Sequence, residues 1–173
     1  MKSPIRPDLL IAYLAAASVV AHVLEAALPG PGPWFKLGLA NIFTLVAFFH
    51  IGWRGAALVS LIRVLAGSLA LGTFLSPTFF LSFSGAIAAV SVLGIASFVP
   101  VKIGPVGLSI LASLAHMSSQ VLVAWWLIVG HDGLFLILPW FLIGAWISGL
   151  LTGLLAYLIL TRIEKHHPLE ARW

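Results

Sequence analysis

The stretch LVSLIRVLAG, residues 58–67, carries a single arginine in the middle of an otherwise apolar run. Arg63 has no acidic residue within one helical turn on either side, so its neighbours in the chain cannot neutralise its charge. A permanent cation inside an apolar helix is costly in a membrane, and such residues usually face a cavity or a partner group. The stretch therefore predicts a transmembrane helix with one face turned towards a polar site.

The composition of the whole chain also indicates a membrane protein. Of its 173 residues, 61% are hydrophobic and only 8% are charged, against roughly 25% charged residues in a soluble domain. The mean hydropathy is +1.13. The nine Lys and Arg residues are scattered between apolar runs, so membrane topology explains the net charge of +4 better than a nucleic-acid partner does. The chain has no cysteine, which excludes disulfides and thiolate metal sites.

Proline, glycine and charged residues divide the chain into six apolar spans, which predict one all-α transmembrane domain over residues 1–173. The spans are Leu9–Leu28, Phe35–Ile51, Arg54–Gly72, Phe79–Val99, Val106–Val129 and Leu136–Leu160. The second span is short for a hydrocarbon core about 30 Å thick, so it is either tilted or begins in the preceding loop. The first span follows two basic residues, as a signal peptide would, but its length favours a retained helix.

The distribution of basic residues predicts the orientation of this six-span domain. Seven of them fall on one side of the membrane, and these are Lys2, Arg6, Arg54, Lys102, Arg162, Lys165 and Arg172. On the other side there is only Lys36. Because basic residues are retained in the cytoplasm, we expect both termini to be cytoplasmic.

Polar side chains lie in the middle or outer half of five of the spans. The predicted substrate-binding residues among them are His22, Glu25, Asn41, Arg63, Ser82, Ser84, His116 and Gln120. Thr44, Ser60, Ser109 and Ser113 share helix faces with some of these, but hydroxyls alone often join helix pairs. Since polar groups in lipid usually face a cavity or each other, we expect a pocket that opens outwards. The sixth span instead carries Gly144, Ser148, Gly149 and Gly153, a pattern typical of close helix packing.

The segment LPGPGPWFKLGLAN, residues 28–41, contains three prolines and three glycines. It cannot form a lipid-exposed helix, because the backbone groups freed by proline need partners. We expect a loop folded over the pocket, with Trp34 and Lys36 as substrate contacts. The alternative is an ordinary interfacial turn with an aromatic anchor.

Structural explanations compete with substrate binding for several of these residues. His22, Glu25 and His116 are of the types that bind metals, but one histidine on each of two helices is thin evidence, and we predict no metal and no cofactor. His116 and Gln120 could belong to a hydrogen-bond network without a ligand. Arg63 either pairs with Glu25 or meets an anionic group of the substrate.

Three stretches carry a resemblance to a known family: FKLGLANIFTL (35–45), LIRVLAGSLALGTFLSPTFFLSFSGAI (61–87) and GLSILASLAHMSSQVLVA (107–124). They resemble the bacterial membrane family called Gx transporter or heptaprenyl diphosphate synthase component I. That family is similar to the substrate-binding S components of energy-coupling factor (ECF) vitamin transporters. The resemblance implies a six-helix bundle that captures a small, anionic or amphipathic, vitamin-like or isoprenoid-related molecule from outside.

The same resemblance implies partners. An S component works with a membrane coupling protein and two ABC ATPases, and it commonly docks through small residues of its first helix. In this chain those residues are Ala12, Ala16, Ala17 and Ala21. The chain itself has no P-loop motif, so we expect ATP hydrolysis in the partner subunits.

The family name implies a prenyl diphosphate synthase activity, and the sequence can be searched for the residues that this activity requires. Prenyl diphosphate synthases hold magnesium against the diphosphate with aspartate-rich clusters, because Mg²⁺ prefers carboxylate oxygens. This chain has five acidic residues, and no two of them lie within three positions of each other. We therefore expect a non-enzymatic importer subunit, with a non-catalytic membrane subunit of isoprenoid or quinone metabolism as the alternative.

Overall fold

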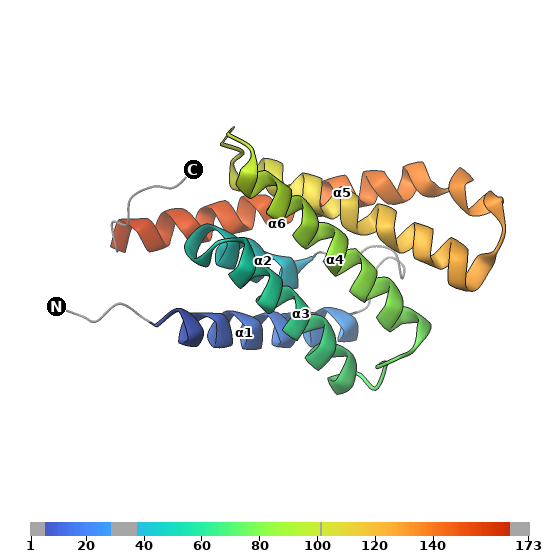
Figure 1. The fold of residues 1–173 in the computed structure, drawn as a ribbon, viewed down its shortest axis with the longest axis horizontal. Helices are drawn as coiled ribbons and strands as arrows, with labels where there is room; N and C mark the ends of the chain where they lie inside the picture. The colour runs from blue at the N-terminus through green and yellow to red at the C-terminus, as the bar shows by residue number, and fades with distance from the viewer. Residues whose placement is uncertain (1–5, 29–37, 101, 167–173) are drawn as a thin grey trace.

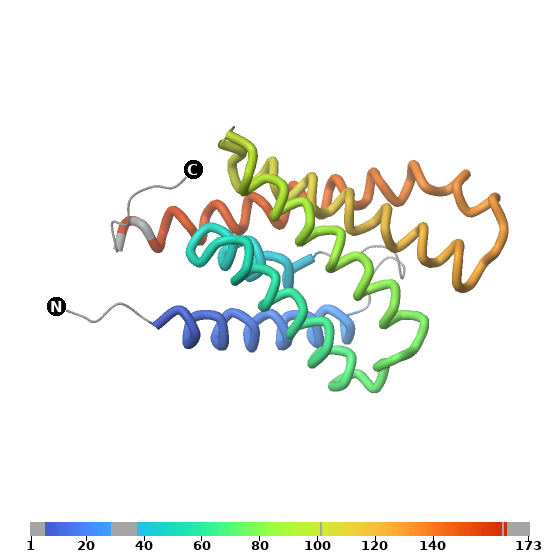
Figure 2. Tube along the Cα trace, in the orientation of Figure 1, coloured from blue at the N-terminus to red at the C-terminus, as the bar shows by residue number. Residues whose placement is uncertain are grey.

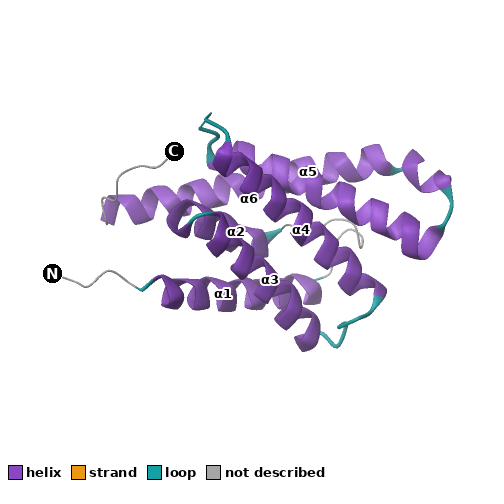
Figure 3. Ribbon diagram, in the orientation of Figure 1, coloured by secondary structure: helices purple, strands orange, loops and turns teal. Residues whose placement is uncertain are grey.

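The computed structural model describes residues 6–28, 38–100 and 102–166. In this part of the chain the secondary structure is entirely helical (Figures 1 and 3). The six main helices are α1 (Pro7–Ala27), α2 (Leu39–Ile51), α3 (Trp53–Ala70), α4 (Pro77–Phe98), α5 (Pro105–Ala124) and α6 (Leu138–His166). A π-helical turn, Trp125–Val129, continues α5, and a 3-10 turn, Asp132–Leu136, leads into α6. All six predicted spans are thus confirmed as helices.

Local sequence explains where several of these helices begin. Proline occupies the first turn of α1, α4 and α5, where its missing amide hydrogen is not needed. At α4 the Ser76 hydroxyl also accepts a hydrogen bond from the amide of Phe79, at 3.4 Å, as an N-cap does. Five of the described helices are long and apolar enough to cross a membrane, and α2 is the shorter one.

The start of α2 differs from the prediction, which placed it at Phe35. The helix begins at Leu39, directly after Gly38, whose φ of 74° is left-handed. A right-handed helix cannot run through that conformation, which glycine adopts at little cost. The short second span is therefore a short helix within the bundle.

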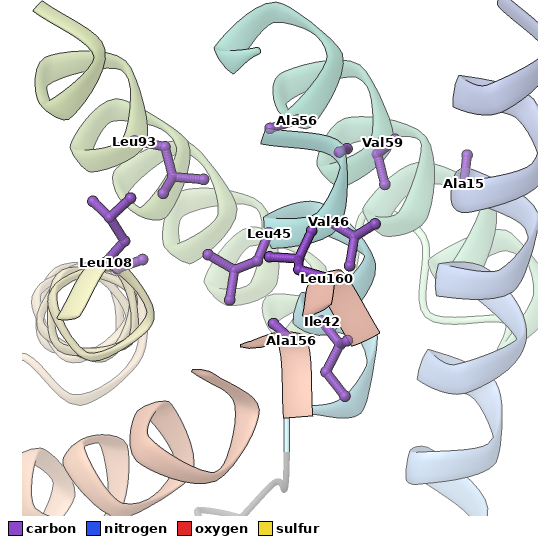
Figure 4. Packing of buried hydrophobic residues seen from close by; sticks show 12 residues of the cluster. Ala15, Ile42, Leu45, Val46, Ala56, Val59, Leu93, Leu108, Ala156 and Leu160 are labelled. Atoms are coloured by element: carbon purple, nitrogen blue, oxygen red, sulfur yellow. The ribbon is translucent and has the colours of Figure 1, made fainter. Parts of the chain in front are cut away.

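The hydrophobic core forms around α2, which packs against α1, α3 and α6. Ile42, Leu45 and Val46 of α2 are buried and contribute to the main cluster, where Leu93 of α4 and Leu160 of α6 join them (Figure 4). Apolar side chains on the outward faces of the other helices are exposed, as expected for surfaces in contact with lipid. The start of α1 and the end of α6 lie at the same end of the bundle (Figure 2).

Helices α5 and α6 approach each other closely at two glycines. A Cβ atom added at Gly149 would lie 2.8 Å from Cα of Ile110, and one added at Gly153 would lie 2.7 Å from Cα of Val106. Neither position leaves room for a side chain. The predicted close packing of the sixth span is confirmed at these two residues.

Candidate functional site

Arg63 lies in the interior of the bundle, on α3, with only 6% of its surface exposed. One guanidinium nitrogen, Nη1, donates a hydrogen bond to Oδ1 of Asn41 on α2, at 2.7 Å. The Nε atom is also buried but has no hydrogen-bond partner. The cation is therefore held from one side by a neutral amide.

Glu25, the acidic residue predicted within the membrane, does not form an ion pair with Arg63. Its two carboxylate oxygens instead accept hydrogen bonds from the backbone amides of Leu39, at 3.0 Å, and Ala40, at 3.5 Å. These amides belong to the first turn of α2, where they have no partner within the helix and where the helix dipole favours negative charge. Glu25 acts on Arg63 only through longer-range electrostatics.

Two more hydrogen bonds anchor the N-terminus of α2, one from α1 and one from α6. Ser18 of α1 is fully buried and donates a hydrogen bond to the carbonyl of Ala40, at 2.8 Å. Thr152 of α6 donates to the carbonyl of Gly38, at 3.5 Å. A Cβ atom at Gly38 would lie 3.0 Å from the hydroxyl oxygen of Thr152, so the site also requires a small residue. Two helices, α1 and α6, thus determine where α2 begins.

The two predicted site histidines pack against glycines of neighbouring helices. A Cβ atom at Gly67 of α3 would lie 2.6 Å from Cδ2 of His22. A Cβ atom at Gly85 of α4 would lie 2.7 Å from Cε1 of His116. Each glycine therefore provides the space that one imidazole ring occupies. Within the described residues, no group of three or more His, Cys, Asp or Glu could hold a metal ion.

The remaining predicted site residues that the structure describes are Ser82, Ser84 and Gln120, on α4 and α5. The Ser84 hydroxyl donates to the carbonyl of Leu81 on its own helix, at 2.9 Å. Ser82 and Gln120 are half-buried. Trp34 and Lys36, the predicted loop contacts, lie outside the described residues.

A small polar cavity lies between α2, α3, α4 and α5, next to the Arg63–Asn41 hydrogen bond. Its volume is about 20 Å³, and it is lined by Asn41, Thr44, Leu45, Ser60, Ala89, Leu93, Ser109, Ala112 and Ser113. Of these, only Asn41 was predicted as a site residue. The four lining hydroxyl residues were visible in the sequence as i, i+3 and i, i+4 neighbours of polar residues, but that spacing does not distinguish a cavity from a helix contact.

The predicted docking residues of α1 are divided between two faces. Ala12 and Ala16 are exposed, whereas Ala17 and Ala21 are half-buried. The helix packs on α2 and α3 through the opposite side, where Ala15 is buried. Only the Ala12–Ala16 pair is therefore fully available to another protein or to lipid.

Comparisons with known proteins agree with this architecture. Residues 14–159 match the model of the family described as heptaprenyl diphosphate synthase component I. No curated protein matches the sequence. The fold is similar to that of a solved S component of a bacterial ECF transporter, with a TM-score of 0.66 and 17% sequence identity over 92% of this chain and 96% of that one. The predicted S-component-like helical bundle is thereby confirmed.

Proposed function

This chain belongs to the heptaprenyl diphosphate synthase component I family, and from that membership and its fold we propose that it is the substrate-binding subunit of an ECF-type importer. It is a multi-pass membrane protein by the length and composition of its helices. In the proposed complex it lies in a bacterial inner membrane with both termini in the cytoplasm. A coupling membrane protein and two ABC ATPases supply the energy for release of the substrate.

The main support for the proposal is that the buried guanidinium of Arg63 is only partly hydrogen-bonded. The guanidinium is buried, one of its nitrogens has no partner, and the nearest intramembrane carboxylate, on Glu25, caps α2 instead. A charge removed from water is stabilised only by a counter-charge or by several hydrogen bonds. We propose that an anionic or strongly hydrogen-bond-accepting group of the substrate offsets this cost when it binds.

The other proposed contacts lie on α1, α2, α4 and α5. They are His22, Asn41, Ser82, Ser84, His116 and Gln120, with Glu25 at the edge of the site. The cavity of about 20 Å³ beside Arg63 is far smaller than the roughly 300–1,000 Å³ of a small-molecule pocket. Substrate entry therefore requires the helices around Arg63 to separate, which favours an outward-opening capture step over a permanent channel.

Native mass spectrometry tests this proposal directly. The protein would be purified from its own membranes in mild detergent, and any small molecule retained by the folded protein would be identified by mass. We expect an anionic compound on the wild-type chain and none on an Arg63→Gln variant of equal yield. Retention of the same compound by both proteins would exclude Arg63 as its partner.

The family description favours a second candidate, a non-catalytic membrane subunit in isoprenoid or quinone metabolism. The two candidates differ in the protein that binds this chain. Affinity purification from native membranes should recover a coupling protein with ATPases under the first and a soluble prenyltransferase subunit under the second. Recovery of the prenyltransferase alone would replace the importer proposal.

A further inference from the structure

The polar cavity lies one helical turn from the Arg63–Asn41 hydrogen bond, in the direction of the turn that joins α2 to α3. Thr44 follows Asn41 by three residues on α2, and Ser60 precedes Arg63 by three residues on α3. A single residue, Gly52, connects these packed helices. Thr44 is therefore nearer to the α2–α3 turn than Asn41 is, and Ser60 is nearer to it than Arg63 is. The cavity is therefore lined by Asn41 but not by Arg63, and it extends from Asn41 towards the α2–α3 turn.

The lining of this cavity combines apolar side chains with several groups that can form hydrogen bonds. Five of its nine residues carry a hydroxyl or an amide, and they come from three helices: Asn41, Thr44, Ser60, Ser109 and Ser113. Thr44 is only 5% exposed, and its Oγ1 atom has no hydrogen-bond partner. A buried hydroxyl without a hydrogen-bond partner destabilises the fold. Because Thr44 lines the cavity, a molecule bound there could supply that partner.

We propose that the cavity binds one internal water molecule, held by Thr44 and the serine hydroxyls of α3 and α5. A volume of about 20 Å³ exceeds the roughly 10–15 Å³ that one water needs, and two to four polar partners are typical of such sites. Hydroxyls both donate and accept hydrogen bonds, which suits a neutral molecule. A cation is disfavoured, because the lining contains no carboxylate and Arg63 lies one turn away. This site does not depend on the importer function.

Replacement of Thr44 by valine distinguishes a hydrated cavity from a dry one by the sign of its effect. Valine has nearly the same shape but no hydroxyl. If water is bound, Thr44→Val removes one of its partners, and we expect the melting temperature in detergent to fall by roughly 2–4 °C. If the cavity is dry, the variant removes an unsatisfied hydroxyl, and the melting temperature will stay the same or rise. That result would overturn the proposal.

Hydroxyl-radical footprinting of the wild-type protein provides a second test that needs no variant to fold. Radicals generated from a bound water oxidise the side chains beside it, so we expect oxidation of Leu45 and Leu93, which are only 3% and 1% exposed. Leu160, which is fully buried and does not line the cavity, is the control and should stay unmodified. Ala112→Val fills the cavity and should abolish the signal. Unmodified Leu45 and Leu93 in the wild-type chain would rule out the water.

Discussion

The carboxylate of Glu25 on α1 accepts a hydrogen bond from the backbone amide of Leu39, 3.0 Å away, at the point where α2 begins. Two residues further on, Asn41 accepts a hydrogen bond from Arg63. The negative and the positive side chain therefore both bind the same short helix, and they do not pair with each other. This arrangement satisfies the carboxylate within the protein and leaves the guanidinium only partly satisfied.

Removal of the Glu25 carboxylate should destabilise the bundle. Glu25→Ala leaves two amides of the first turn of α2 without acceptors, and we expect a loss of about 1–2 kcal/mol in the free energy of unfolding, comparable to the loss of a helix cap. Glu25→Gln keeps one acceptor oxygen and should lose less. Thermal unfolding in detergent measures both, with the exposed Asp8→Asn as a control. Equal melting temperatures for Glu25→Ala and the wild type would contradict the cap.

Loss of the charge at position 63 should reduce substrate binding more than stability. In a direct Arg63–Glu25 ion pair, Arg63→Gln would strand a buried carboxylate and cost about 3–5 kcal/mol. Because Glu25 is bonded to α2, we expect the substrate-free variant to melt within a few degrees of the wild type. A large drop in its melting temperature would favour the ion pair after all.

The space that Gly85 provides for His116 should be essential for binding. In Gly85→Ala the new methyl group would lie 2.7 Å from the imidazole, so the ring must move away from its position. We expect at least a tenfold loss of affinity for the retained substrate, measured by titration calorimetry. Gly94→Ala on the same helix is the matched control, because a Cβ atom there would lie 3.9 Å from Cε3 of Trp53, an ordinary van der Waals contact. Equal affinities in the two variants would remove His116 from the site.

The contact between α5 and α6 should not tolerate a methyl group at Gly149. The added Cβ would lie 2.8 Å from the backbone of Ile110, which cannot rotate away as a side chain can. Overpacking of this kind costs about 1–3 kcal/mol, whereas alanine for glycine at an open helix position is neutral or stabilising. Gly149→Ala should therefore melt below Gly94→Ala in the same assay. The reverse order would show that the two helices can separate freely.

The exposed face of α1 should be the surface that binds the coupling protein. Ala16 is exposed, and a bulky residue there prevents the close approach that small residues permit. Ala16→Trp should lose the coupling protein in co-purification while retaining the substrate. Ile95→Trp, on an exposed position of α4, is the control and should keep both. Wild-type recovery of the coupling protein with Ala16→Trp would place docking elsewhere.

Most of the helical architecture could be predicted from the sequence, because it depends on local properties. The length of an apolar run and the breakers at its ends decide whether a segment crosses a membrane. The predicted starts of the fourth and fifth spans, Phe79 and Val106, lie within two residues of the observed starts at Pro77 and Pro105. The start of α2 could not be predicted in this way. It depends on Glu25, Ser18 and Thr152, which meet the chain near Gly38 only after α1 and α6 have packed around it.

The apolar run around Arg63 is enough to predict a buried cation that needs a partner, since such a charge is costly in any arrangement of the helices. Which partner it meets depends on helix packing, which brings Asn41 to Arg63 and lets Glu25 cap α2. The same holds for the cavity beside Thr44, whose polar lining comes from three helices. Helix periodicity shows which residues share a face, but the rotation and depth of each helix against its neighbours decide which faces meet.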